Sequence, residues 1–297
     1  MRALDGVDDA FCLIDDIGVA SDDEEQHLAA LEEIFRRLLA LGLTMRPDKL
    51  VLLAEEVEFL GHTVRRGGEL KITDEKIRAV KDWPRCKTVG EIRAFLGFVG
   101  YCRKFIRGYS EIALPLIRLT KKDAPFVWSD QCEKAFQRLK DEMVKAPCLI
   151  VPDPDGGEMH LFTDASGNGL GYVLAQESKI DHRKVLRPCA FGSRLFKGSE
   201  CNYSIPEKEC LAAVWSIKKN HPYLYGRLFR LHTDSEGVYH TLRRQGAAEP
   251  TTSRLSRFAF DVMGYSFHTH HVRTDKNWAD SLSRLPTVKD AKTGELM

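Results

Sequence analysis

Four acidic residues stand at predicted junctions between strands, helices and loops, in the order strand end, helix, strand end and helix start. They are Asp164, Glu209, Asp234 and Asp280. Elements in this order can bring four carboxylates to one edge of a sheet. Mg²⁺ prefers oxygen ligands. Two such ions held about 4 Å apart can activate water and stabilise the leaving oxygen during phosphodiester cleavage. The spacing therefore suggests a two-metal site.

Asp164 alone has a simpler interpretation. It follows an apolar run, 159–163, and precedes a glycine-containing turn, after which a second strand is predicted from Gly171. Aspartate is common in turns and caps, where its carboxylate bonds nearby backbone. The three later acids favour the metal hypothesis over this one.

Four segments together resemble the RNase H domain of gypsy-type long-terminal-repeat retrotransposons, over roughly 148 to 286. They are Thr163-Asp-Ala-Ser, Tyr203-Ser-Ile-Pro-Glu-Lys-Glu, His232-Thr-Asp and Ala279-Asp-Ser-Leu-Ser-Arg. The resemblance implies Mg²⁺, or Mn²⁺ in its place, on Asp164, Glu209, Asp234 and Asp280, and cleavage of the RNA strand of an RNA–DNA hybrid. Glu207 is the rival to Glu209. Glu209 is preferred because the family's glutamate directly precedes a Leu-Ala-like stretch, here Cys210-Leu-Ala.

The resemblance also implies a mobile histidine upstream of the last aspartate, which assists product departure. By position this is His271. The loop between them is one residue shorter than the family's, with Arg273-Thr-Asp replacing Pro-Gly-Lys, and this departure concerns His271 more than Asp280. His268, His270 and His271 also raise a zinc alternative, but no Cys or Glu has suitable spacing.

The composition is that of a soluble globular protein of two or three domains: 297 residues, 43% hydrophobic and 29% charged. The net charge of +1 gives no global basic field, so nucleic acid would have to bind local patches. Neither a signal peptide nor an apolar run of about 18 residues is present. The eight cysteines form no C-x-x-C pair and are expected to be reduced, buried thiols. We expect an intracellular protein, in a cytoplasmic particle or the nucleus.

Residues 1 to 70 contain two apolar half-strands that meet at Asp15 and Asp16, a helix over 23–41, and an alternating strand over 55–64. The acidic pair could be a solvated turn. The segment resembles the second half of a reverse transcriptase palm, which implies that the pair binds catalytic metal. It also implies that the primer is gripped by a hairpin formed by Phe59, Leu60, Gly61 and His62.

Two departures from the palm pattern are evident. Leu13 stands where the family has Tyr or Phe. The strand carrying another metal-binding aspartate, and the fingers, would precede Met1. We therefore expect a fragment of a longer polyprotein, or a truncated gene model, that does not polymerise by itself.

Three helices are predicted over 72–83, 88–106 and 130–145, with N-caps at Thr73 and Thr88. They could form a small bundle with a solvated basic face. The segment also resembles the reverse transcriptase thumb, whose helix packs into the minor groove of the primer–template duplex. That implies contacts to nucleic acid from Arg93, Gly97, Arg103 and Lys104. Arg254 and Arg257, in a later predicted helix, could face phosphates or solvent.

The expected architecture is α/β (α+β): a partial polymerase palm at 1–70, a thumb-like helical domain at 71–147 and an RNase H-like domain at 148–287, with a flexible tail at 288–297. The last domain should contain a mixed five-stranded sheet flanked by helices. Expected partners are an RNA–DNA hybrid, a primer–template duplex and the rest of the Pol polyprotein, including the fingers, upstream palm and downstream integrase. The sequence gives no oligomeric state.

Three functions compete at this stage. The first is an RNase H enzyme, which the four carboxylates favour. The second is a nucleic-acid-binding remnant without turnover. The third is a DNA nuclease of the same superfamily, which the palm and thumb segments upstream disfavour.

Overall fold

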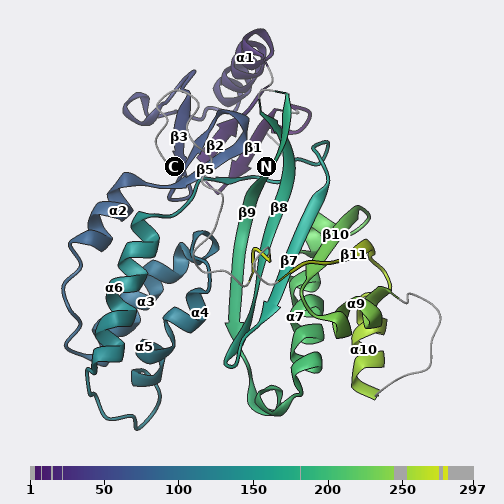
Figure 1. Cartoon of the computed structure of the whole chain (residues 1–297). Helices are drawn as coiled ribbons and strands as arrows, with labels where there is room; N and C mark the ends of the chain where they lie inside the picture. Colours follow the sequence, from purple (N-terminus) through teal and green to yellow (C-terminus); the bar gives the residue numbers. More distant parts are fainter. Residues whose placement is uncertain are drawn as a thin grey trace. The chain divides into compact units, whose positions relative to one another are not determined.

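The structure is a computed structural model that describes residues 4–7, 9–14, 16–21, 23–180, 182–243, 253–273 and 277–279 (Figure 1). The chain divides into two compact units, Met1–Ala54 and Glu55–Met297. The domain limits expected at 70, 147 and 287 stay predictions. No helix in the described ranges is long and apolar enough to cross a membrane. All eight cysteines are free thiols, but the expectation that they are buried was wrong for Cys201, which is exposed, and for Cys12 and Cys148, which are half-buried.

The first unit contains a hairpin and one long helix. Strands β1 (Ala10–Leu13) and β2 (Asp16–Val19) pair antiparallel. Helix α1 (Glu24–Ala40) begins where the carboxylate of Asp23 accepts a hydrogen bond from the backbone of Gln26, 2.8 Å away. This cap satisfies one of the helix's free N–H groups.

A four-stranded sheet opens the second unit, in the order β3 (Glu56–Phe59), β4 (His62–Arg65), β5 (Glu69–Ile72) and β6 (Leu149–Ile150). The single strand predicted over 55–64 was wrong. The chain reverses at Leu60 and Gly61, whose φ angles are +48° and +64°. Positive φ at both central residues is the geometry of a tight two-residue hairpin turn, and glycine adopts it without steric cost.

Five helices follow: α2 (Asp74–Lys81), α3 (Val89–Tyr101), α4 (Tyr109–Ile112), α5 (Leu114–Leu119) and α6 (Asp130–Val144). Thr73 and Thr88 cap α2 and α3, as predicted. The expected continuation of α3 to residue 106 was wrong. The chain turns into a 3₁₀ helix, Arg103–Phe105, which brings Phe105 and Ile106 into the core. The sequence analysis missed the short helices α4 and α5.

The predicted mixed five-stranded sheet is confirmed, in the order β11-β10-β7-β8-β9. Strands β7, β8 and β9 pair antiparallel, whereas β10 runs parallel to both β7 and β11. The strands are Met159–Ala165, Gly169–Ile180, Arg183–Leu195, Leu228–Thr233 and Ser266–His271 for β7 to β11. Helices α7 (Ile205–Lys219), α8 (His221–Leu224), α9 (Glu236–Arg243) and α10 (Ser253–Asp261) complete the described part of this region.

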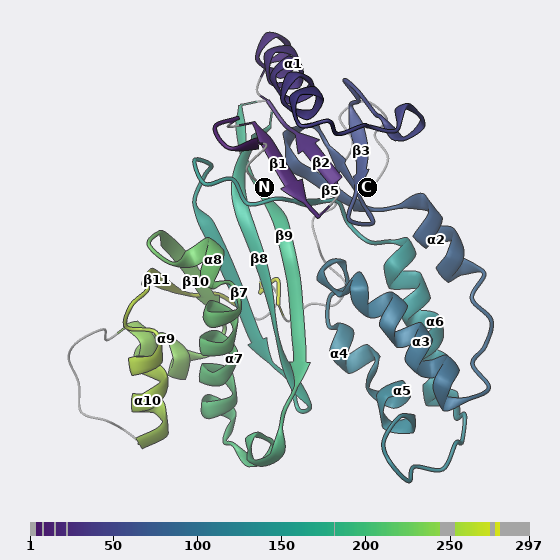
Figure 2. The same cartoon turned by 180° about the vertical axis from the view of Figure 1, so that it is seen from behind.

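The sheet is packed on both faces. Helix α7 lies across one face, where Leu161 and Leu231 of the sheet share a core with Ala213 and Ile217 of the helix (Figure 2). On the other face Phe162, Val173 and Phe191 belong to the same apolar core as helices α2 to α6. The five-stranded sheet and helices α2 to α6 are therefore joined by continuous packing.

Replacing Phe95 of α3 tests how much this shared core contributes to stability. Phe95 is fully buried, with its ring centroid 4.6 Å from that of Phe136 and 5.7 Å from that of Trp83. We expect Phe95→Ala to lower the free energy of unfolding by about 3–5 kcal/mol, because it removes apolar contacts and leaves a cavity. Urea denaturation followed by tryptophan fluorescence measures the loss. Phe126→Ala, at a half-exposed ring, is the matched control and should change little. Equal losses in both variants contradict this packing.

Candidate active site

The register of two parallel strands places Asp164 beside Asp234. Strands β7 and β10 pair from Met159↔Phe229 to Phe162↔His232. Continuing the same register by two residues puts Asp234 next to Asp164. Parallel strands end at the same edge of their sheet, so both carboxylates emerge there.

Glu209 reaches this edge from α7. Carboxylate oxygens of Asp164, Glu209 and Asp234 all lie within 4.8 Å of one another. Glu209 is 9% exposed, and the two aspartates are half-buried. Three like charges this close repel one another unless a cation sits among them. Their donor atoms are all oxygens, which is the set that Mg²⁺ prefers.

Asp280, the fourth expected ligand, lies outside the described residues. The described residues just before it are tied to the strand that carries Asp164. Asn277 is 1% exposed, and its side-chain amide donates to the carbonyl of Thr163 at 3.0 Å. The ring of Trp278 stacks on Phe162, with centroids 5.1 Å apart.

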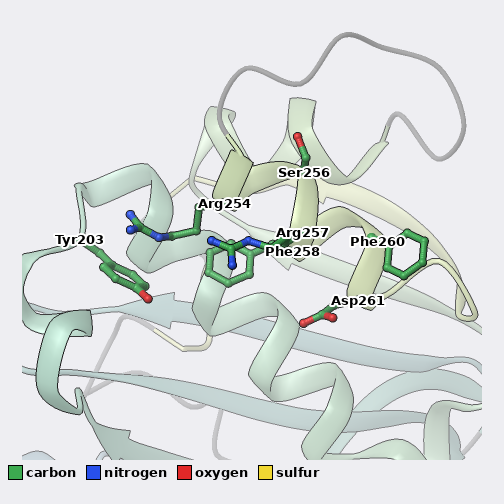
Figure 3. A pocket seen from close by; sticks show the side chains of 7 residues that line it. All are labelled: Tyr203, Arg254, Ser256, Arg257, Phe258, Phe260 and Asp261. Atoms are coloured by element: carbon green, nitrogen blue, oxygen red, sulfur yellow. The ribbon is translucent and has the colours of Figure 1, made fainter.

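The rival glutamate, Glu207, has a different environment. Its carboxylate accepts hydrogen bonds from the backbone and hydroxyl of Ser204, both at 2.9 Å, and so caps α7. Arg254 pairs with its other oxygen at 2.5 Å and lies over the ring of Tyr203 (Figure 3). The Ser204 backbone bond, followed by the hydroxyl and Arg254, lowers the pKa of Glu207. Both oxygens of Glu207 are thus engaged in holding the start of the helix.

Arg254 lines a shallow hollow formed mainly by α10 (Figure 3). Arg257, Phe258 and Asp261 lie along the same helix. The guanidinium of Arg254 is paired with Glu207 and so supports the helix cap, while 37% of its side chain stays exposed to solvent.

His271 is the last residue of β11 and lies at the same sheet edge. It pairs in register with Thr233, and its Nε2 is 3.0 Å from the carbonyl oxygen of Asp234. The side chain is exposed. Among the described residues, no cluster suited to a metal includes His268, His270 or His271.

The turn that follows Asp164 is hydrogen-bonded to helix α4. Ser166 donates a hydrogen bond to the carboxylate of Glu111 in α4 and accepts one from the backbone of Gly169 at 3.1 Å. Ser110, beside Glu111, donates two hydrogen bonds of 2.9 Å to Ser193 of β9, one from its backbone N–H to the hydroxyl and one from its hydroxyl to the backbone carbonyl. The sequence analysis missed Glu111, which lies 55 residues from Ser166 and carries no local signal.

The first unit contains the acidic pair expected from the palm resemblance. Asp16 is exposed at the start of β2, opposite Leu13. Asp15 lies outside the described residues. An exposed acid at a hairpin end fits both a solvated turn and a metal ligand.

The hairpin of β3 and β4 is hydrogen-bonded to helices α2 and α3. Leu60, at its turn, is 50% exposed, and its carbonyl accepts a hydrogen bond from the hydroxyl of Tyr101. Lys76 donates to the carbonyl of Gly61 at 2.9 Å. Phe59, at the end of β3, is half-buried. The turn is therefore held in place with Leu60 outward.

His62 lies beneath this turn rather than on its surface. It is 7% exposed and stacks on Tyr101, with ring centroids 5.2 Å apart. Burial, and then the nearby charges of Lys104 and Lys76, lower the pKa of His62 to about 4. A neutral, buried imidazole supports the hairpin and does not present a charge to a ligand.

The exposed side of helix α3 contains a glycine. Arg93 and Gly97 are one turn apart on its exposed side, opposite the buried Ile92, Phe95 and Val99. A Cβ added at Gly97 would meet no described atom within 4 Å. Packing inside the described chain therefore gives no reason for glycine here.

The basic residues at the end of α3 differ in exposure. Arg103 is exposed, whereas Lys104 is half-buried, with its ammonium 5.4 Å from the ring centroid of Phe105. Burial lowers the pKa of Lys104. Arg93 donates to the carbonyl of Thr120 at 3.2 Å and remains exposed.

Fold and site together define a chain with reverse transcriptase and RNase H-like parts. Residues 8–64 match the family model of reverse transcriptase (RNA-dependent DNA polymerase). Residues 128–231 match the RNase H-like domain found in reverse transcriptase. Over most of its length the chain is also similar to retrotransposon Pol polyproteins, among them 412, gypsy and Tf2-3.

The curated relatives are much longer than this chain. The Pol polyprotein from transposon 412 of Drosophila melanogaster is 33% identical over 291 residues, covering 97% of this chain and 23% of the relative. The gypsy polyprotein of the same species is 29% identical over 288 residues, covering 92% and 26%. The Tf2-3 polyprotein of Schizosaccharomyces pombe is 30% identical over 293 residues, covering 96% and 22%. The chain thus spans about a quarter of their length.

Solved structures of a foamy viral protease-reverse transcriptase share the fold. The complex with dsDNA has a TM-score of 0.74 at 20% identity, covering 91% of this chain and 56% of that one. The complex with an RNA/DNA hybrid has a TM-score of 0.73 at 19% identity, covering 98% and 39%.

Glu209 and Glu207 can be separated by metal binding. We expect Glu209→Gln to weaken Mg²⁺ binding more than about tenfold, because it removes an ionised oxygen from the cluster. Glu207→Gln is the matched control. It should keep the Mg²⁺ affinity and lose about 1 kcal/mol of stability, because it weakens the cap of α7. Isothermal titration calorimetry and thermal denaturation measure the two effects. A reversed pattern assigns the site to Glu207.

Proposed function

We propose that this chain cleaves the RNA strand of an RNA–DNA hybrid, using Mg²⁺, or Mn²⁺ in its place, held by Asp164, Glu209, Asp234 and Asp280. The observation that carries the proposal is the convergence of three carboxylates, from two strands and a helix, within 4.8 Å at one sheet edge. The match of residues 128–231 to an RNase H-like domain supports the same chemistry.

The acidic residues have distinct positions in this proposal. Asp164 and Asp234 hold ions from adjacent strand ends, and Glu209 holds them from the side of α7. Asn277 ties the segment before Asp280 to Thr163, which supports Asp280 as the fourth ligand. The bound ions supply an activated water and stabilise charge on the scissile phosphate. His271, exposed at the same edge, assists departure of the cleaved strand.

The thumb-like helices hold the duplex. Gly97 costs α3 about 1 kcal/mol relative to alanine, and packing inside the described chain does not offset that cost. Close approach of a nucleic acid backbone would offset it. Arg93, Arg103 and Lys104 contact phosphates, and the hairpin with Phe59, Leu60, Gly61 and His62 supports the primer strand. The 2′-hydroxyls of one strand distinguish a hybrid from DNA duplex.

RNA-directed DNA polymerisation is proposed for the longer Pol polyprotein, with Asp15 and Asp16 among its metal ligands. The palm resemblance and the match of residues 8–64 to reverse transcriptase support this assignment. The 297-residue chain by itself is not expected to extend a primer, because that reaction needs a further carboxylate and a template grip. Further polyprotein segments, including an integrase, are proposed partners.

Asp164→Asn tests the enzyme proposal. We expect it to abolish Mg²⁺-dependent cleavage of an RNA–DNA hybrid, because the metal ligands are needed for turnover. The affinity for the hybrid should stay nearly unchanged, because it depends mainly on contacts to phosphates. Gel analysis of strand-labelled hybrid gives cleavage, and fluorescence anisotropy gives affinity. Asp155→Asn, at an exposed loop position, is the matched control and should retain activity.

Two outcomes of this assay would support the competing functions. Wild-type protein that binds hybrid with strong salt dependence but never cleaves it, with Mg²⁺ or Mn²⁺, is a binding remnant. Equal cutting of DNA duplex and hybrid indicates a DNA nuclease.

Gly97→Ala should separate stability from binding. We expect the variant to gain up to about 1 kcal/mol in stability, because alanine favours helix over glycine and the added methyl has room. Affinity for hybrid should nevertheless fall, because the methyl holds the duplex away from α3. Denaturation and fluorescence anisotropy measure the two changes. Gln137→Ala, on the exposed side of α6, is the control and should not weaken binding. Unchanged affinity for Gly97→Ala removes α3 from the duplex interface.

A further inference from the structure

A second group of possible metal ligands lies away from the carboxylates of the candidate active site. Atoms of Glu158, His160 and Glu177 that could bind a metal lie within 4.8 Å of one another. Glu158 directly precedes β7, His160 is its second residue, and Glu177 lies on the antiparallel β8. The backbone of Glu177 donates to the carbonyl of Glu158 at 2.9 Å, so the strand pairing itself holds the three residues together.

His160 carries an unsatisfied nitrogen into this group. Its side chain is buried, with the residue 5% exposed, and Nε2 has no hydrogen-bond partner among the described residues. Nε2 lies 3.4 Å from Oε1 of Glu177. Two ligand atoms about 2.0–2.1 Å from a tetrahedral zinc ion are roughly 3.3 Å apart. The observed separation therefore matches the edge of a zinc coordination tetrahedron.

The other ring nitrogen of His160, Nδ1, contacts a second histidine. Nδ1 lies 3.0 Å from Nε2 of His232 on β10, and the two rings stack with centroids 5.1 Å apart. If Nδ1 carries the proton and donates it to His232, the lone pair of Nε2 points at the two glutamates. A hydrogen bond of this kind, to the second ring nitrogen, is what orients metal-binding histidines.

Both carboxylates are oriented by basic side chains. Arg230 binds Oε2 of Glu158 at 2.7 Å, and Lys184 binds Oε2 of Glu177 at 2.9 Å. In each case the contact is to one oxygen of the carboxylate, so the second oxygen is the one that would face a metal. Hydrogen-bonded carboxylates of this kind are usual around metal ions.

We propose that Glu158, His160 and Glu177 bind one Zn²⁺ ion, with water as the fourth ligand, in a structural site that joins β7 to β8. An imidazole nitrogen favours Zn²⁺ over Mg²⁺, whereas the all-oxygen cluster at Asp164 favours Mg²⁺. His160 and Asp164 are four residues apart on β7, roughly 13 Å along an extended strand. The zinc ion is therefore too distant to join the chemistry at Asp164, and this proposal does not depend on the proposed function.

The test uses the untagged full chain carrying Asp164→Asn and Asp234→Asn, which removes the other cluster as a zinc site. Zn²⁺ is titrated by calorimetry in excess Mg²⁺, and bound metal is counted after dialysis. We expect one Zn²⁺ per chain. Adding Glu177→Gln or Glu158→Gln, both isosteric and at half-buried positions, should weaken binding more than about tenfold. Zn²⁺ should also raise the melting temperature of the parent chain and not that of the Gln variants.

Two controls separate this site from other zinc ligands. Cys201→Ser removes an exposed thiol, and His270→Asn removes an imidazole that stacks on His232, with centroids 5.5 Å apart, but lies outside the group. Both should keep the full zinc affinity. Circular dichroism confirms that each variant is folded. The proposal is overturned if the parent chain binds no stoichiometric Zn²⁺, if the Gln variants bind it equally well, or if either control loses it.

Discussion

The parallel pairing of β7 with β10 is the constraint on which the candidate active site depends. Its register aligns the ends of two strands that each terminate near an aspartate, Asp164 and Asp234. A slip of one residue would move every side chain of a strand to the opposite face. Leu161 and Leu231, opposite each other in this pairing and fully buried under α7, prevent that slip. Apolar packing thus fixes the positions of charged groups that would otherwise repel one another.

The same packing explains how repelling carboxylates are held in a folded protein. Glu209 sits on α7, whose Ala212, Ala213 and Ile217 are fully buried. These contacts and the cap at Glu207 hold the helix in place. Glu209 therefore keeps its position even though its carboxylate and those of the two aspartates repel one another. In the proposed metal site, a bound cation would then neutralise the cluster rather than assemble it.

Donor chemistry distinguishes the two ends of β7. At its carboxyl end, oxygen atoms alone converge, and they suit a hard ion. Near its start, an imidazole and two carboxylates converge beside a row of stacked rings formed by His160, His232 and His270. The thumb-like helices meet this sheet through a shared core and through the bonds from Ser110 and Glu111. The first cluster takes its residues from β7, helix α7 and the position just after β10, and the second takes its residues from the start of β7 and from β8.

The sequence by itself determined much of this protein. Local periodicity and residue type predicted the helices over 23–41 and 130–145, the caps at Thr73 and Thr88, and the strand before Asp164, because these features depend on residues a few positions apart. The sequence motifs around Asp164, Glu209 and Asp234 indicated these three residues as candidate metal ligands. Only the tertiary structure showed that the turn at Leu60 and Gly61 splits a strand, that His62 is buried, and that Glu111 meets Ser166. It alone brought His160 to Glu177. Each of these depends on contacts between distant segments or on a backbone reversal, and neither leaves a periodic signal in the sequence.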